Sequence, residues 1–134
     1  MKTPFKQIMI IDDNPVDLYI GSRMIINNLF AEKVNECSSA SEALQFLQNN
    51  QDDPEKLPQV IFVDIYMPEM SGFDFMDQYA MLPPSLKNHC RVYILSSSID
   101  DTDIVRSQVD PNTGVFLVKP ITKEFLDRIA DGTY

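Results

Sequence analysis

Short apolar runs recur along the chain at intervals that suit the strands of a parallel β-sheet. Most of these runs are continuous rather than alternating, which is the pattern of strands covered on both faces. The intervals between the runs are long enough for a crossover helix each. The second run is the weakest. Five strands are therefore predicted, at residues 8–11, 34–37, 60–63, 92–95 and 115–118.

Helical patterns fill the intervals between these runs. The first helix follows Asn14-Pro15, where Asn is a suitable cap and Pro suits the first turn. Strict alternation of strands and helices predicts an α/β fold of the (βα)5 type, a doubly wound sheet with right-handed crossovers. Segments 49–59 and 82–90 break the periodicity with Pro and polar residues and are predicted to be loops. The remaining helices are predicted near residues 41–48, 73–81, 101–108 and 122–130.

A helical wheel gives the first helix one broad apolar face, which we expect to pack on the sheet. Asp17, Gly21 and Asn28 fall on the opposite face and are expected to point outward. The expected inward face consists of Leu18, Tyr19, Ile25, Ile26, Leu29 and Phe30.

Composition limits the class of protein. With 134 residues, of which 44% are hydrophobic and 23% charged, residues 1–134 are predicted to form a single domain with a real core and no room for an output domain. The net charge of −9 argues against binding to nucleic acid or to an anionic membrane surface. No apolar run is long enough for a membrane span. Cys37 and Cys90 have no metal or redox spacing and suggest reduced thiols in the cytoplasm.

Polar residues of complementary chemistry follow the predicted strands. In an open parallel sheet, ligands bind beyond the carboxyl ends of the strands, so these residues should meet at one edge. They are Asp12-Asp13 after the first strand, Asp64 after the third, Ser96-Ser97-Ser98 after the fourth and Lys119-Pro120 after the fifth.

Three carboxylates at one edge repel one another unless a cation compensates for their charge. Ligands that are all oxygen favour a hard ion such as Mg²⁺, which binds one or two carboxylates together with waters and a phosphate oxygen. Lys119 adds a fixed positive charge, and the serines add hydroxyl donors. This combination predicts a phosphoryl site in which a carboxylate can also be the nucleophile.

The chain resembles the receiver domains of two-component response regulators, from its first strand to its last. Each matching segment is weak alone, but four at these spacings make a strong signal. The resemblance implies a flavodoxin-like fold with strand order 2-1-3-4-5. The matching segments are Ile10-Ile11-Asp12-Asp13-Asn14, Val63-Asp64-Ile65-Tyr66-Met67-Pro68 with Gly72 eight residues after Asp64, Ile94-Leu95-Ser96-Ser97, and Phe116-Leu117-Val118-Lys119-Pro120.

The resemblance assigns roles to residues of the metal and phosphoryl site. Asp64 would be the phosphoacceptor and, with Asp13, a direct ligand of Mg²⁺. Asp12 would act on the metal through water, and the backbone carbonyl of Tyr66 would complete the protein ligands. Lys119 would pair with a phosphate oxygen.

The resemblance also implies switch and structural residues. Ser96 would bond the acyl phosphate in place of the commoner Thr, although the register alone leaves Ser97 or Ser98 open as the donor. Phe116 stands where the family has the aromatic residue that reports phosphorylation, and it lacks the phenolic hydroxyl of the commoner Tyr. Pro120, after a cis peptide bond, and Gly72 are expected to be structural.

The implied function is that of a stand-alone phosphoacceptor. A histidine kinase or histidine phosphotransfer protein would donate the phosphoryl group to Asp64. The phosphorylated form would contact a downstream protein through the face made by the fourth helix, fifth strand and fifth helix. The only expected activities are self-phosphorylation and self-dephosphorylation, and a homodimer is compatible with this interpretation.

Two alternatives share the sheet topology. An aspartate-nucleophile phosphatase of the haloacid-dehalogenase type needs a second acid two residues after the nucleophile, where this chain has Tyr66. A flavin-binding module needs a hydroxyl- and glycine-rich phosphate loop after the first strand, where Asp12-Asp13 would repel the phosphate. Both are disfavoured.

Overall fold

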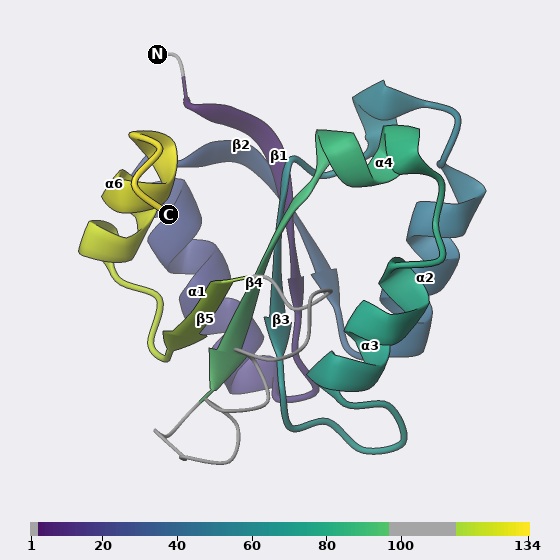
Figure 1. Cartoon of the computed structure of the whole chain (residues 1–134). Coiled ribbons are helices and arrows are strands. Elements are labelled where there is room, and N and C mark those ends of the chain that lie inside the picture. The colour runs from purple at the N-terminus through teal and green to yellow at the C-terminus, as the bar shows by residue number, and fades with distance from the viewer. Residues whose placement is uncertain (1–2, 97–114) are drawn as a thin grey trace.

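Five parallel strands form one sheet in the order β2-β1-β3-β4-β5 (Figure 1). This order confirms the predicted flavodoxin-like topology. The computed structural model describes residues 3–96 and 115–134. The strands are β1 (Phe5–Ile11), β2 (Ala31–Cys37), β3 (Val60–Asp64), β4 (Arg91–Ser96) and β5 (Val115–Val118).

Helices cover both faces of the sheet. Figure 1 shows α1 and α6 on one face and α2 and α3 on the other. The predicted helix at 101–108 lies outside the described residues. Among those described, no helix is long and apolar enough to cross a membrane. The helices are α1 (Pro15–Asn27), α2 (Ala40–Asn49), α3 (Gly72–Tyr79), α4 (Pro84–His89) and α6 (Lys123–Ala130).

Both predicted loops contain short helical segments, so the loop prediction was wrong in part. Residues Pro54–Lys56 form a 3₁₀ turn, and Pro84–His89 forms the single-turn helix α4. Proline suits the first position of each because its missing N–H would have no partner there. Leu86 of α4 is fully buried and anchors this helix to the core. Such short segments have too few apolar residues to show a helical period.

Alternate residues of the central strands enter two separate cores. Ile8 and Ile10 pack beneath α1 and α6, whereas Met9 and Ile11 pack beneath α2 and α3. The five residues of β3 are all buried, as the continuous apolar pattern predicts for a central parallel strand. The strand that carries Asp64 is therefore the most enclosed element of the sheet.

The inward face of α1 differs from the wheel prediction. Gly21, predicted to point outward, is buried, and a Cβ built there would lie 3.1 Å from Ile10 Cδ1. Leu18 and Ile25 are buried beside it, whereas Tyr19 and Ile26 are exposed by 65% and 38%. The wheel follows hydrophobicity alone, but the missing side chain at Gly21 lets α1 approach β1 closely. That close approach determines which face is buried.

Ile25 and Ile26 provide a matched test of this face. Ile25→Ala should lower the free energy of unfolding by about 2–5 kcal/mol, because its side chain is fully buried. Ile26→Ala should change it by less than about 1 kcal/mol, because that side chain is 38% exposed. Chemical denaturation of both variants gives the comparison. Equal losses would mean that the face is assigned wrongly.

Candidate functional site

The predicted polar residues meet at the carboxyl edge of the sheet. Asp12 follows β1, Asp64 ends β3, Ser96 ends β4 and Lys119 follows β5. Asp12, Asp64 and Ser96 are buried, and Lys119 is partly buried. The sequence-based expectation that these side chains share one edge therefore agrees with their positions.

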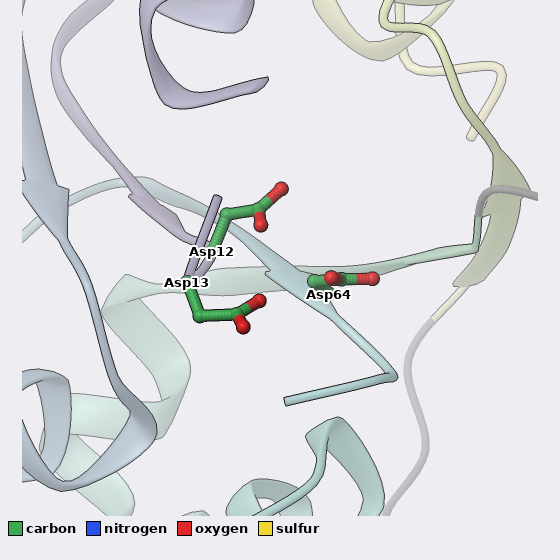
Figure 2. A group of neighbouring side chains, drawn as sticks. All are labelled: Asp12, Asp13 and Asp64. Atoms are coloured by element: carbon green, nitrogen blue, oxygen red, sulfur yellow. The ribbon is translucent and has the colours of Figure 1, made fainter. Parts of the chain in front are cut away.

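Asp12, Asp13 and Asp64 form a cluster of carboxylates. Each offers an oxygen, and these oxygens all lie within 4.8 Å of one another. Figure 2 shows the three side chains next to one another, where β1 and β3 end. Asp13 is exposed and the other two are buried, so a cation could reach the cluster from the side of Asp13. Closely spaced oxygen ligands of this kind fit a hard divalent cation.

Lys119 lies against the buried side of this cluster. Its Nζ donates hydrogen bonds to Asp12 Oδ2 at 2.6 Å and to Asp17 Oδ2 at 3.0 Å, and lies 3.5 Å from Asp64 Oδ2. Burial opposes the charge of the ammonium, but together these bonds and the charges of Asp64 and Asp12 outweigh it. The pKa of Lys119 is therefore raised, and the residue stays cationic at neutral pH.

In contrast to Lys119, Asp64 has a pKa that is shifted against its charged form. Burial raises the pKa of its carboxyl group to about 6, because the enclosed strand end disfavours charge. Lys119 acts against this rise, Asp12 adds to it, and a hydrogen bond from the backbone of Tyr66 lowers it. The ionised form of Asp64 is therefore destabilised unless a further cation binds near it.

Backbone contacts fix the positions of the acids. Gly72, the first residue of α3, lies so close to β3 that a Cβ there would be 2.7 Å from the carbonyl oxygen of Asp64. Its amide donates to Ile65 O at 2.9 Å. On the other side, the amide of Asn14 donates to Asp12 Oδ1 at 2.9 Å. Gly72 therefore has a structural reason to lack a side chain.

The remaining predicted residues surround this group. Ser96 is fully buried, and its carbonyl accepts a 2.7 Å hydrogen bond from the amide of Lys119. The Lys119–Pro120 peptide is cis, as the resemblance implied. Phe116 is partly buried against the core beneath α2 and α3, and Tyr66 is 52% exposed. Ser97 and Ser98, the alternative donors, lie outside the described residues.

Asp17 is a site residue that the sequence analysis missed. The wheel placed it outward, but its carboxylate bonds Lys119. The sequence signal that could have found it is the helix cap. Asn14 accepts hydrogen bonds from the amides of Val16 and Asp17. With Asn14 as the cap, Asp17 is the third helical residue. An acid at that position reaches back over the start of its helix, here toward the end of β1.

Known proteins resemble this chain in sequence. The family model for the response regulator receiver domain matches residues 8–131. The two-component response regulator ARR2 of Arabidopsis thaliana is 27% identical over 126 residues, which cover 92% of this chain but only 17% of ARR2. The chain thus spans a small part of that relative.

Two solved structures share the fold. A two-component response regulator from Cytophaga hutchinsonii superposes with a TM-score of 0.86 at 23% identity, over 98% of this chain and 97% of that one. The receiver domain of the histidine kinase CKI1 from Arabidopsis thaliana, solved in complex with Mg²⁺ and BeF₃⁻, gives a TM-score of 0.71 at 22% identity. It covers 94% of this chain and 85% of that chain.

The raised pKa of Asp64 predicts that this carboxylate costs stability without metal. Because the pKa of Asp64 is raised from 3.8 to about 6 on folding, protonated Asp64 adds to the free energy of unfolding below pH 4. That contribution is lost as the pH rises through 6. Asp64→Asn should therefore raise the free energy of unfolding at pH 7.5 in EDTA by about 1–3 kcal/mol. At pH 4 the gain should shrink.

Denaturant titrations at both pH values test this expectation, with the exposed Asp77→Asn as the matched control. Added Mg²⁺ should stabilise the wild-type chain more than Asp64→Asn, because a ligand that binds the folded state more tightly stabilises it more. A loss of stability in Asp64→Asn at pH 7.5 in EDTA would contradict the electrostatic assignment.

Proposed function

Because this chain belongs to the response regulator receiver domain family, we propose that it accepts a phosphoryl group on Asp64. The observation that carries the proposal is the position of that carboxylate. It ends a buried strand, belongs to a cluster of three carboxylates and lies 3.5 Å from the ammonium of Lys119. A nucleophile, a place for a cation and a fixed positive charge are the parts that phosphoryl transfer needs.

The carboxylate cluster fits Mg²⁺. Asp13 and Asp64 would be direct ligands, Asp12 would act through water, and the backbone carbonyl of Tyr66 would complete the protein ligands. When bound, the ion would offset the negative charge of the carboxylates and of a phosphoryl oxygen. The receiver domain of CKI1, solved with Mg²⁺ and BeF₃⁻, supports this assignment by its related fold.

In the transfer, an oxygen of Asp64 attacks the phosphorus of a phosphohistidine. A phosphorus–oxygen bond forms while the phosphorus–nitrogen bond breaks, and the imidazole nitrogen leaves with the electron pair. Lys119 pairs with a phosphoryl oxygen and offsets the negative charge there. The hydroxyl of Ser96 donates to another oxygen, and Phe116 beside β4 responds to that new bond as the switch residue. Donors placed where negative charge develops stabilise the phosphoryl oxygens during the transfer.

The phosphatase alternative lacks its second acid. Position 66, two residues after the nucleophile, is a half-exposed tyrosine. Receiver domains are generally not enzymes that turn over a separate substrate. The activity proposed here is accordingly limited to gaining and losing the phosphoryl group on Asp64.

The donor would be a histidine kinase or a histidine phosphotransfer protein, and α1 offers a surface for it. Val16, Tyr19 and Ile20 are exposed by 61%, 65% and 49% in the first turns of α1, directly after the acids that follow β1. A protein that brings phosphohistidine to Asp64 must cover this edge of the sheet. These three side chains, here called the α1 patch, would then gain apolar burial.

The output surface would be formed by β5, α6 and the predicted helix at 101–108, which lies outside the described residues. We place the protein in the cytoplasm, as the sequence suggested. The two cysteines, Cys37 and Cys90, are buried and unpaired, and burial raises the pKa of both thiols to about 12. They would stay reduced and unreactive there.

Asp64→Ala should abolish phosphoryl acceptance, because the variant lacks the nucleophilic oxygen. The measurement is the intact mass after incubation with acetyl phosphate and Mg²⁺. The wild-type chain and the control Asp77→Ala should each gain the mass of one phosphoryl group, and EDTA should suppress the gain. Retained labelling in Asp64→Ala would refute Asp64 as the acceptor.

Tyr19→Glu should slow transfer from a protein donor about 10-fold or more, because a buried charge would replace an apolar contact at the interface. The donor is the histidine kinase that labels the wild-type chain fastest in a panel. Labelling by acetyl phosphate should stay within about twofold. Met81→Glu, at an 82% exposed residue after the far end of α3, is the matched control. Equal slowing by both variants would argue against the α1 patch.

A further inference from the structure

Lys119 also bonds Asp17, a carboxylate outside the cluster of Asp12, Asp13 and Asp64. The ammonium donates to Asp12 at 2.6 Å and to Asp17 at 3.0 Å, whereas its contact with Asp64 is a longer ion pair of 3.5 Å. The two shortest contacts of Nζ are therefore with the acid after β1 and the acid of α1, and the proposed acceptor is farther away. The side chain of Lys119 is only 15% exposed, so water replaces these partners poorly.

The position of Asp17 is fixed by its helix. Asn14 caps α1 by accepting from the amides of Val16 and Asp17, so the carboxylate of Asp17 extends from a well-held first turn. Asp17 also lines a small pocket of about 90 Å³ between α1 and the segment Lys119-Pro120-Ile121. The contact between Asp17 and Lys119 thus connects α1 to the segment after β5.

Asp12 and Asp17 differ in what a cation would do to them. Asp12 belongs to the cluster whose oxygens lie within 4.8 Å of one another, and a cation bound there would weaken its attraction for Lys119. Asp17 is not a member of that cluster. Its attraction for the ammonium would persist when the site is loaded, at the moment when a phosphoryl oxygen needs the same group.

We propose that Asp17 is a positioning residue that competes with the phosphoryl group for Lys119. It holds the ammonium toward α1 and so lowers the affinity of the site for a phosphoryl group. This inference rests on the proposed function, since it concerns the same acceptor site. A structural role at the start of the helix would affect stability, but would not favour anion binding when the charge is removed.

The test compares Asp17→Asn with the wild-type chain and with the control Asp77→Asn. At saturating Mg²⁺, titration with beryllium fluoride, a mimic of the phosphoryl group, should show about 3- to 10-fold tighter binding to Asp17→Asn, the size expected for a part-exposed charge interaction. Mg²⁺ affinity without the anion should stay equal or fall, since a negative charge has been removed. A loosened site would weaken the binding of both ions, so tighter beryllium fluoride binding without tighter Mg²⁺ binding distinguishes competition from damage.

The initial rate with acetyl phosphate supplies a second readout. In that reaction Asp64 attacks phosphorus, the bond from phosphorus to the acetate oxygen breaks, and acetate leaves with the electron pair. Asp17→Asn should react faster than wild type, and Asp17→Glu, which keeps the charge, should return toward the wild-type rate. In a Lys119→Gln background, Asp17→Asn should change the rate by much less, because Asp17 is argued to act through Lys119.

The outcomes separate this inference from the proposed function. A wild-type chain that gains no phosphoryl group would overturn both. A wild-type chain that is labelled on Asp64, together with unchanged or weaker beryllium fluoride binding in Asp17→Asn, would overturn the competition alone. An undiminished effect of Asp17→Asn in the Lys119→Gln background would also overturn it.

Discussion

Several carboxylates share one ammonium group at the edge of a buried sheet, so negative charge exceeds positive charge there. The rest of the site depends on this excess. Asp12, Asp17 and Asp64 all contact Lys119, and Asp13 stands beside them. Coulomb repulsion among the acids is strong where protein replaces water. Burial is the main cause of the raised pKa of Asp64, and the charge of Asp12 adds to it. The excess of negative charge makes a divalent cation a suitable ligand for this edge, and burial of Asp64 makes that compensation more important.

The fold keeps the acids from relieving this repulsion by moving apart. The backbone of Gly72 rests against that of Asp64 at a distance that no side chain could tolerate. The amide of Lys119 is bonded to the carbonyl of Ser96, which ties the segment after β5 to the end of β4. With the backbone held on three strands, the charge is balanced by protonation of Asp64, by a cation that binds at the edge, or by a change in which acid Lys119 pairs with.

Helix α1 brings two roles of the proposed site together. Its first turn carries Asp17, which bonds Lys119, and the same turns expose the α1 patch. A donor protein on this patch would therefore touch the helix that holds the ammonium toward β1. Gly21 sets this arrangement, because it lets α1 lie close to β1 with Leu18 and Ile25 inward. The apolar residues left on the outer side are then free for a partner.

The sequence alone determined the sheet and the site edge, for physical reasons. Continuous apolar runs rich in β-branched residues, such as Val60–Val63, suit strands covered on both faces, and parallel strands bring Asp12, Asp64 and Lys119 to one edge. Tertiary structure alone decided which face of α1 is buried, because the wheel ranks side chains by hydrophobicity and cannot register a close approach at Gly21. It also decided that Asp17 meets Lys119. That contact joins residues 102 positions apart. The cap at Asn14 places Asp17 in the first turn of α1, but only the way α1 lies across β1 brings its carboxylate to Lys119.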